Sequence, residues 1–310
     1  MDLYLLKAGY ILITKFYKKI MKLHTFYLLL FTSFISIKIN AQVEPTYSLY
    51  RYNTSFFNPA AFGNEEKVAI TTNFRSQFLG IDYAPETQSI SLGIPLNEKM
   101  KIGTIVIADK VFIESNTSLF ASLSYGIQIG KETDLLFGLQ AGGSFVSIDF
   151  GKLNLPKDPY LSKDPNYFNP NMGVGFYVKN EKYYASLSVP RLFETDRIAD
   201  ENGVATQANN NVQFYISGGY YFDISDKIKL IPSTLVRFSQ EEIIADATAT
   251  VQFFEKFDLG VNYRLDSAIG GLFYITIKDR LQLGYAYESN LSDINKYDNG
   301  THEFGLNFRF

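Results

Sequence analysis

The last ten residues of the chain, THEFGLNFRF (301–310), carry the pattern that most restricts the fold. Apolar residues alternate there with polar or small ones, in the order Glu303, Phe304, Gly305, Leu306, Asn307, Phe308, Arg309 and Phe310. A period of two places the four apolar side chains on one face of a β-strand. Chain ends of soluble domains usually fray, so such a face there is unusual. The pattern predicts a strand with apolar surroundings up to the last residue.

The same alternation recurs along the chain and predicts about fourteen strands. Many of them have about ten residues or more, whereas strands of soluble sheets usually have five or six. A tilted strand needs about 9 to 11 residues to cross a bilayer. The expected strands are 67–77, 87–95, 99–109, 117–130, 133–149, 170–180, 182–190, 211–223, 226–238, 243–254, 256–265, 267–278, 280–289 and 302–310. We therefore expect an all-β fold, a transmembrane antiparallel up-and-down β-barrel over residues 67–310.

The connections between the expected strands support this interpretation. Every second one is very short and charged, whereas most of the others are longer, as expected when turns of one kind share one side of a membrane. The longer ones are 78–86, 110–116, 150–169, 191–210 and 290–301. An even strand count returns the chain to its starting side, so both mature termini are expected on the periplasmic side.

The start of the chain reads as a targeting segment. Residues 21–41 combine Lys22, an apolar run of about 15 residues and a small-residue cleavage site before Gln42, as in a secretory signal peptide. Residues 1–20 then read as an upstream extension before the true start at Met21. The mature protein is expected to be exported.

Residues 42–66, QVEPTYSLYRYNTSFFNPAAFGNEE, precede the first expected strand. They contain too many aromatic residues for a free tail. Two interpretations stay open: an ordered lead-in at the periplasmic mouth, or a short plug in the lumen. Inward positions of the strands predict a wet, charged lumen, through Arg75, Lys179, Arg237, Arg264, Asp246 and Asp258.

Composition excludes several functions. The chain has no Cys, which excludes disulfides, thiolate metal sites and a Cys nucleophile. Its net charge of −3 does not favour nucleic acid as a partner. His302 is the only His that remains after the signal peptide. We expect no enzyme, no catalytic residue, no cofactor and no metal site. In the long connection 156–170, Tyr160 and Tyr167 are either surface contacts for a secreted partner or part of a cap on the mouth.

Four segments together resemble the PorP/SprF family of type IX secretion: YSLYRYNTSFFNPAAFG (47–63), FRSQF (74–78), PETQSISLGIP (85–95) and HEFGLNFRF (302–310). The resemblance implies a barrel in the Gram-negative outer membrane that helps to export or retain specific cargo proteins, in some members for gliding motility. It implies outer-membrane lipid, other secretion components and cargo C-terminal domains as partners.

Two sets of residues follow from the resemblance. The first is a family signature of unknown mechanism, expected to act in docking: Asn58, Pro59, Ala60, Ala61 and Gly63. The second is the C-terminal aromatic pair Phe308 and Phe310, which looks like a signal for outer-membrane assembly.

The main alternative is a solute-transport barrel, either a porin or one similar to the long-chain fatty-acid transporters. The latter carry an Asn-Pro-Ala sequence in an N-terminal hatch, which Asn58-Pro59-Ala60 matches. A lead-in of about 25 residues is short for such a hatch.

Overall fold

The computed structural model describes residues 45–153, 166–196, 209–240, 242–278 and 280–310. Gln42–Phe310 form one compact unit. The predicted extension 1–20 and signal peptide 21–41 lie outside the described residues, so both stay predictions. Within the described ranges, no helix has the length and apolar character needed to cross a membrane.

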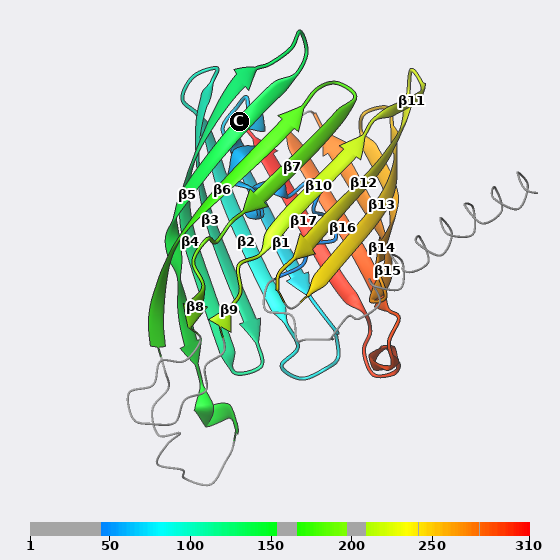
Figure 1. The fold of residues 1–310 in the computed structure, drawn as a ribbon. Helices are drawn as coiled ribbons and strands as arrows, with labels where there is room; N and C mark the ends of the chain where they lie inside the picture. Colours follow the sequence, from blue (N-terminus) through cyan, green and yellow to red (C-terminus); the bar gives the residue numbers. More distant parts are fainter. Residues whose placement is uncertain (1–44, 154–165, 197–208, 241, 279) are drawn as a thin grey trace, which may run out of the picture. The chain divides into compact units, whose positions relative to one another are not determined.

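Long antiparallel strands make up most of the fold (Figure 1). The strands of the main sheet are β1 (Ala69–Ser76), β2 (Glu86–Pro95), β3 (Met100–Val111), β4 (Glu114–Gln128), β5 (Asp134–Ile148), β6 (Asn166–Lys179), β7 (Tyr183–Val189), β10 (Phe214–Tyr220), β11 (Phe222–Ser225), β12 (Ile228–Phe238), β13 (Ile243–Phe253), β14 (Phe257–Arg264), β15 (Ala268–Ile277), β16 (Leu281–Asn290) and β17 (Thr301–Arg309). The short strands β8 (Thr195–Asp196) and β9 (Asn209–Asn210) pair with each other in the connection between β7 and β10.

The main sheet closes on itself as a 14-stranded barrel. It contains 15 strands, but β10 and β11 are separated by one residue and both pair with β12, so they form one strand of the wall. β10 also pairs with β7, and β1 pairs with β17 from Ala69↔Arg309 to Ser76↔His302. The expected barrel is confirmed.

The period-two pattern separates the two faces of the wall. On β17, Phe304 is 52% exposed on the outer face, whereas its neighbour Glu303 is fully buried on the inner face. Exposed aromatic and aliphatic side chains thus cover the outer face around the barrel. The inner face carries most of the buried polar side chains, together with apolar ones such as Ile105 and Leu235 that pack on the segment before β1. This is the arrangement of a barrel that lies in lipid.

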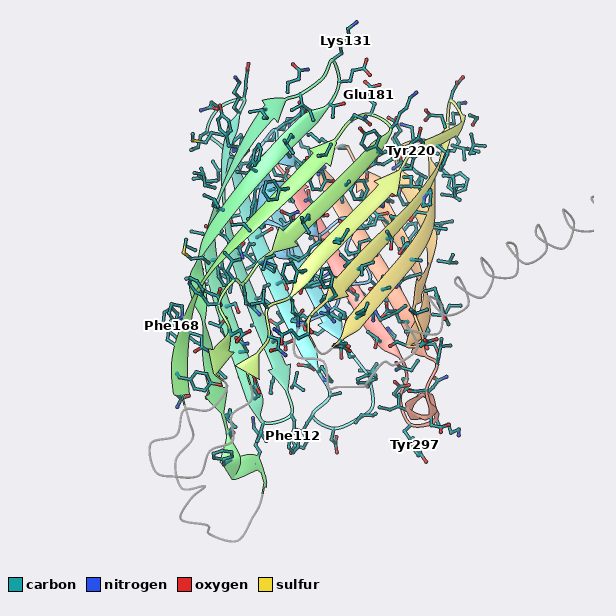
Figure 2. The ribbon with its side chains drawn as sticks, viewed as in Figure 1. Phe112, Lys131, Phe168, Glu181, Tyr220 and Tyr297 are labelled. Carbon is teal, nitrogen blue, oxygen red and sulfur yellow. The ribbon has the colours of Figure 1, made fainter. Side chains whose placement is uncertain are left out.

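The connections fall at two ends of the barrel. Figure 2 shows Lys131 and Glu181 in short turns at one end, and Phe112 and Tyr297 at the other. The expected longer connection 110–116 is wrong, because β3 and β4 continue until only Phe112 and Ile113 join them. Phe112 makes this tight turn with a positive φ of 54°, and its N–H donates to the Tyr83 carbonyl at 3.1 Å. The connections 149–165, 190–213 and 291–300 at this end are long.

The segment before β1 lies inside the barrel (blue in Figure 1) and runs from the long-loop end to the short-turn end. The Pro45 carbonyl accepts a bond from Arg237, near the end of β12, at 3.0 Å. Glu65, at the other end of the segment, lies 3.7 Å from Arg309. Pro45, the first described residue, therefore lies towards the long-loop end, whereas the expected mature N-terminus at Gln42 lies outside the described residues, so its periplasmic location stays a prediction. An even number of strands determines only that β1 begins on the side of the membrane where β17 ends. Before β1, the described chain passes through the lumen.

This direction gives a topological prediction. An epitope inserted before Pro45 is expected to be accessible to antibody on intact cells, because Pro45 lies towards the long loops. An epitope in the short turn at Glu132 is expected to become accessible only after the outer membrane is permeabilised. Heat-dependent gel mobility would verify that both barrels fold. The reverse labelling pattern would contradict the direction of the segment.

Candidate functional site: a plug inside the barrel

Residues 45–64, called the plug below, lie in the lumen and contain two short 3-10 helices. The first, η1 (Thr54–Phe56), follows a bend at residues 48–52, and the second is η2 (Pro59–Asn64). Asn58 caps η2, since its side-chain oxygen accepts from the Ala60 N–H at 2.9 Å. Pro59 follows at the first helical position, where a missing N–H and a fixed φ are favourable. The local sequence thus accounts for η2.

The same residues fasten η2 to the wall. The Asn58 amide donates to the Phe176 carbonyl on β6 at 3.1 Å, and Ser124 on β4 donates to the Ala60 carbonyl at 3.0 Å. The approach is so close that a Cβ on Gly138 would lie 2.1 Å from the Ala60 nitrogen, and one on Gly175 would lie 2.0 Å from the Asn58 oxygen. The inner wall is therefore shaped to accept this segment.

A buried charge network fastens the first part of the plug. The Glu303 carboxylate on β17 accepts from the Ser48 and Leu49 N–H groups at 2.6 and 3.2 Å. It also pairs with Arg75 on β1 at 2.9 Å, and Arg75 donates to the Ser48 hydroxyl at 2.6 Å. A carboxylate with several N–H donors and a guanidinium partner compensates the cost of its burial.

The network extends across the lumen. The second Arg75 nitrogen lies 2.6 Å from Glu288 on β16, which Arg264 on β14 also contacts at 3.1 Å. Arg264 in turn lies 3.0 Å from Asp246 on β13. Five wall residues from five strands therefore share two positive and three negative charges.

A second ionic contact lies nearer the short-turn end. The Arg51 guanidinium lies 2.6 Å from the Asp258 carboxylate on β14, and the Tyr52 hydroxyl donates to the same carboxylate at 2.6 Å. The Tyr52 ring stacks on Tyr274 with centroids 3.7 Å apart. The plug is thus held at both ends and along opposite sides of the barrel.

The expected wet, charged lumen needs a correction. Arg75, Arg237, Arg264, Asp246 and Asp258 do face inward, but they are buried against the plug and one another; Lys179, at the end of β6, stays partly exposed. Two cavities along the plug, both lined by Pro45 and Tyr47, measure about 20 and 10 Å³. Each has room for about one water, which is too little for solute diffusion.

The structure gathers the family signature on η2 and buries most of it. Asn58, Pro59, Ala60 and Ala61 have at most 6% exposure, and only Gly63 is partly accessible. These side chains therefore contact the wall, and the role of this set in docking stays a prediction. Glu66 and Lys67, which follow η2, are exposed. Burial raises the pKa of Glu65, an effect that Arg309 opposes.

The other expected site residues lie apart from the plug. Tyr160 is outside the described residues. Tyr167 belongs to β6 and not to a loop. The pairing of β5 with β6 continues beyond Pro170 and places Tyr167 opposite Val146. Phe308 faces outward, and Phe310 is 59% exposed with its N–H bonded to the Val68 carbonyl at 3.0 Å. Their role in assembly stays a prediction.

Four residues that hold the plug were not predicted as site residues from the sequence: Ser48, Arg51, Glu288 and Glu303. Glu288 and Glu303 occupy inward positions of the alternating pattern, so that pattern carried the signal. Ser48 and Arg51 lie in irregular structure, where no periodicity marks them.

Comparison with known proteins agrees with this architecture. Residues 39–308 match the family model of the type IX secretion system membrane protein PorP/SprF. The chain belongs to this family. A PorP/SprF protein is a membrane component of type IX secretion, and the barrel places this one in the outer membrane. No curated protein matches the chain.

Several solved structures align with the chain at low sequence identity. The CymD monoaromatic hydrocarbon channel aligns with a TM-score of 0.51 and 12% identity, over 83% of this chain and 92% of its own. A Pseudomonas aeruginosa FadL homologue aligns with 0.46 and 11%, over 82% and 93%. Acinetobacter baumannii Omp33 aligns with 0.46 and 8%, over 79% and 99%. At 12% identity the likeness to CymD shows the barrel fold alone and no specific function.

Replacing Arg75 with Met is expected to lower the free energy of unfolding by about 3–5 kcal/mol, because Glu288 and Glu303 lose a buried partner. Urea unfolding in liposomes measures the change. The control is Lys229→Met, which breaks an exposed pair with Glu255 at 3.0 Å and should cost less than about 1 kcal/mol. Equal losses in the two variants would mean that the network does not hold the fold.

Replacing Gly138 with Val is expected to displace η2, because the new Cβ would collide with the Ala60 backbone. The wild-type barrel should be silent in planar bilayers, and the variant should conduct ions. Gly271→Ala is the control, an exposed position of β15 where the new Cβ would meet no atom closer than 3.7 Å. A folded but silent Gly138→Val barrel would contradict the proposed fit between plug and wall.

Proposed function

We propose that this PorP/SprF protein is a plugged scaffold that helps to export, or to retain at the cell surface, specific cargo proteins of type IX secretion. The family membership supports the system, and the filled lumen supports the scaffold. The observation that carries the proposal is that plug residues contact strands around the whole barrel, among them β2 at Ser89, β6 at Phe176, β12 at Ser233 and β17 at Glu303. A lumen filled in this way favours a scaffold over a channel for solutes.

The partners proposed by family membership are other secretion components and the C-terminal domains of cargo proteins, which include gliding adhesins in some members. The signature residues act indirectly in this proposal. Asn58 and Pro59 fix η2, and η2 sets the position of the exposed residues Glu66 and Lys67 at the short-turn end. These exposed residues are the part of the segment that a periplasmic partner can reach.

Deleting the gene is expected to remove one or a few proteins from the cell surface while bulk outer-membrane permeability stays unchanged. Surface proteomics and uptake of a small antibiotic measure the two effects. Retention of all surface proteins with loss of uptake of a fatty acid or another small solute would contradict the proposal and favour the transport barrel.

Replacing Asn58 with Ala tests the role of the plug within this function. The variant loses the cap on η2 and the bond to β6, so we expect a folded barrel with reduced cargo display. Asn97→Ala is the control, because the Asn97 side chain also makes two hydrogen bonds, both accepted from the Lys99 and Met100 N–H groups, but in an exposed turn. Equal cargo display in both variants would mean that the fixation of the plug by Asn58 has no role in secretion.

A further inference from the structure

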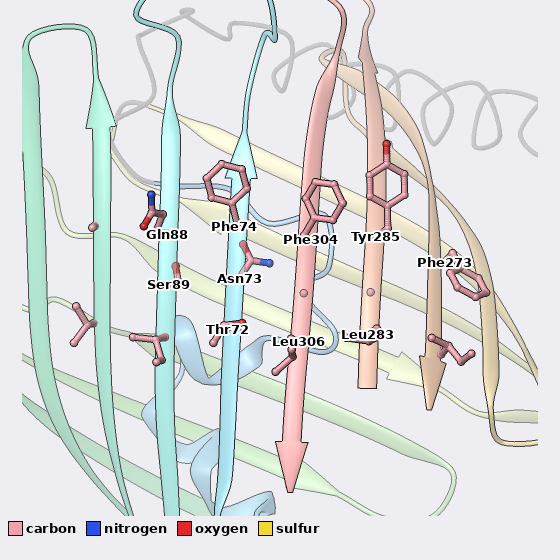
Figure 3. A pocket seen from close by; sticks show the side chains of 16 residues that line it. Thr72, Asn73, Phe74, Gln88, Ser89, Phe273, Leu283, Tyr285, Phe304 and Leu306 are labelled. Carbon is pink, nitrogen blue, oxygen red and sulfur yellow. The ribbon is translucent and has the colours of Figure 1, made fainter. Parts of the chain in front are cut away.

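A groove of about 750 Å³ crosses the outer face of the barrel where β1 and β17 close it (Figure 3). Phe74, Phe304 and Tyr285 form one row of its lining. Thr72, Leu306 and Leu283 form a second row, closer to the short-turn end. The hollow lies between these rows and extends over the neighbouring strands β2, β3 and β15.

The lining of the groove is uncharged. None of its 16 residues is Asp, Glu, Lys, Arg or His, in contrast to the charged lumen on the other side of the same strands. The outward side chains Thr72 and Ala108 are small among larger neighbours, which leaves space at the wall. In a membrane the atoms that line such a space lose dispersion contacts unless a hydrocarbon chain fills it.

The groove does not lead into the lumen. Gly284 on β16 pairs with Gly305 on β17 beneath it, so neither residue places a side chain of its own in the lumen, and the Tyr274 ring lies over Gly284 from inside. Leu49 of the plug, which is fully buried, fills that position from inside. Cβ atoms on the two glycines would lie 3.2 and 3.1 Å from its Cδ1 atom. An occupant therefore stays on the outer face.

The long-loop side of the groove ends in a polar group. The Tyr285 hydroxyl lies 2.9 Å from His302 Nδ1, and the Tyr287 ring packs edge-on to His302. Aromatic residues of this kind mark the membrane interface of outer-membrane barrels. We propose that the groove binds one acyl chain of an outer-leaflet lipid, whose head group lies towards His302 and whose tail crosses the β1–β17 seam.

Tryptophan fluorescence can test this directly, because the chain contains no Trp. Phe304→Trp places a single reporter in the groove. Val261→Trp is the control, an outward residue of β14 that is also fourth from the long-loop end of its strand. Both are reconstituted in phosphatidylcholine vesicles with increasing fractions of a phosphatidylcholine brominated in mid-chain.

The groove reporter is expected to reach half-quenching at a mole fraction of brominated lipid about threefold lower than the control, because a bound chain is enriched beside it. Adding Thr72→Phe, which fills the hollow, should remove this difference. Heat-dependent gel mobility verifies folding, and Phe74→Trp on the neighbouring strand replaces Phe304→Trp if that variant does not fold. Identical quenching curves would overturn the proposal. Weaker quenching of the groove reporter together with dimers in native gels would assign the groove to contact between two copies.

Discussion

The ladder between β1 and β17 is the constraint on which the rest of the molecule depends. Hydrocarbon offers no partner to a backbone N–H or C=O group, and each unpaired group costs several kcal/mol. The eight residue pairs from Ala69↔Arg309 to Ser76↔His302 remove the two edges that an open sheet would expose. Once the sheet is closed, the alternating pattern of every strand has only one arrangement that suits a membrane.

Closure also creates an interior that has to be filled. Part of the inner face is apolar, and part carries buried polar and charged groups, which need either water or protein partners. The plug supplies protein partners, through the Ser48 and Leu49 N–H groups at Glu303 and the Arg51 guanidinium at Asp258. Buried ion pairs add little net stability, but a misplaced plug would leave charges unpaired. The network therefore specifies the position of the plug more than it strengthens the fold.

The wall has different chemistry on its two faces at the same point. At Gly284 and Gly305 it is one backbone thick, with Leu49 on the inside and an uncharged groove on the outside. The inner face thus recognises a segment of its own chain, and the outer face meets lipid. The plugged lumen supports the proposed scaffold over a solute channel.

The sequence by itself determined the barrel. A period of two is a local property, so the fourteen strands, their outward faces and the short turns could be predicted without knowing which strands pair. The family signature could also be found, since it is a contiguous motif. The extent of β3 and β4 up to Phe112, and the place of Tyr167 in β6, depended on cross-strand pairing and could not.

Only the tertiary structure decided what fills the lumen. The choice between lead-in and plug rests on contacts such as Ser48 to Glu303, which are 255 residues apart in the sequence. The direction of the plug and the burial of Asn58 to Ala61 follow from the same long-range contacts. Irregular backbone carries no periodicity, so its position is set by the side chains that surround it once the barrel has closed.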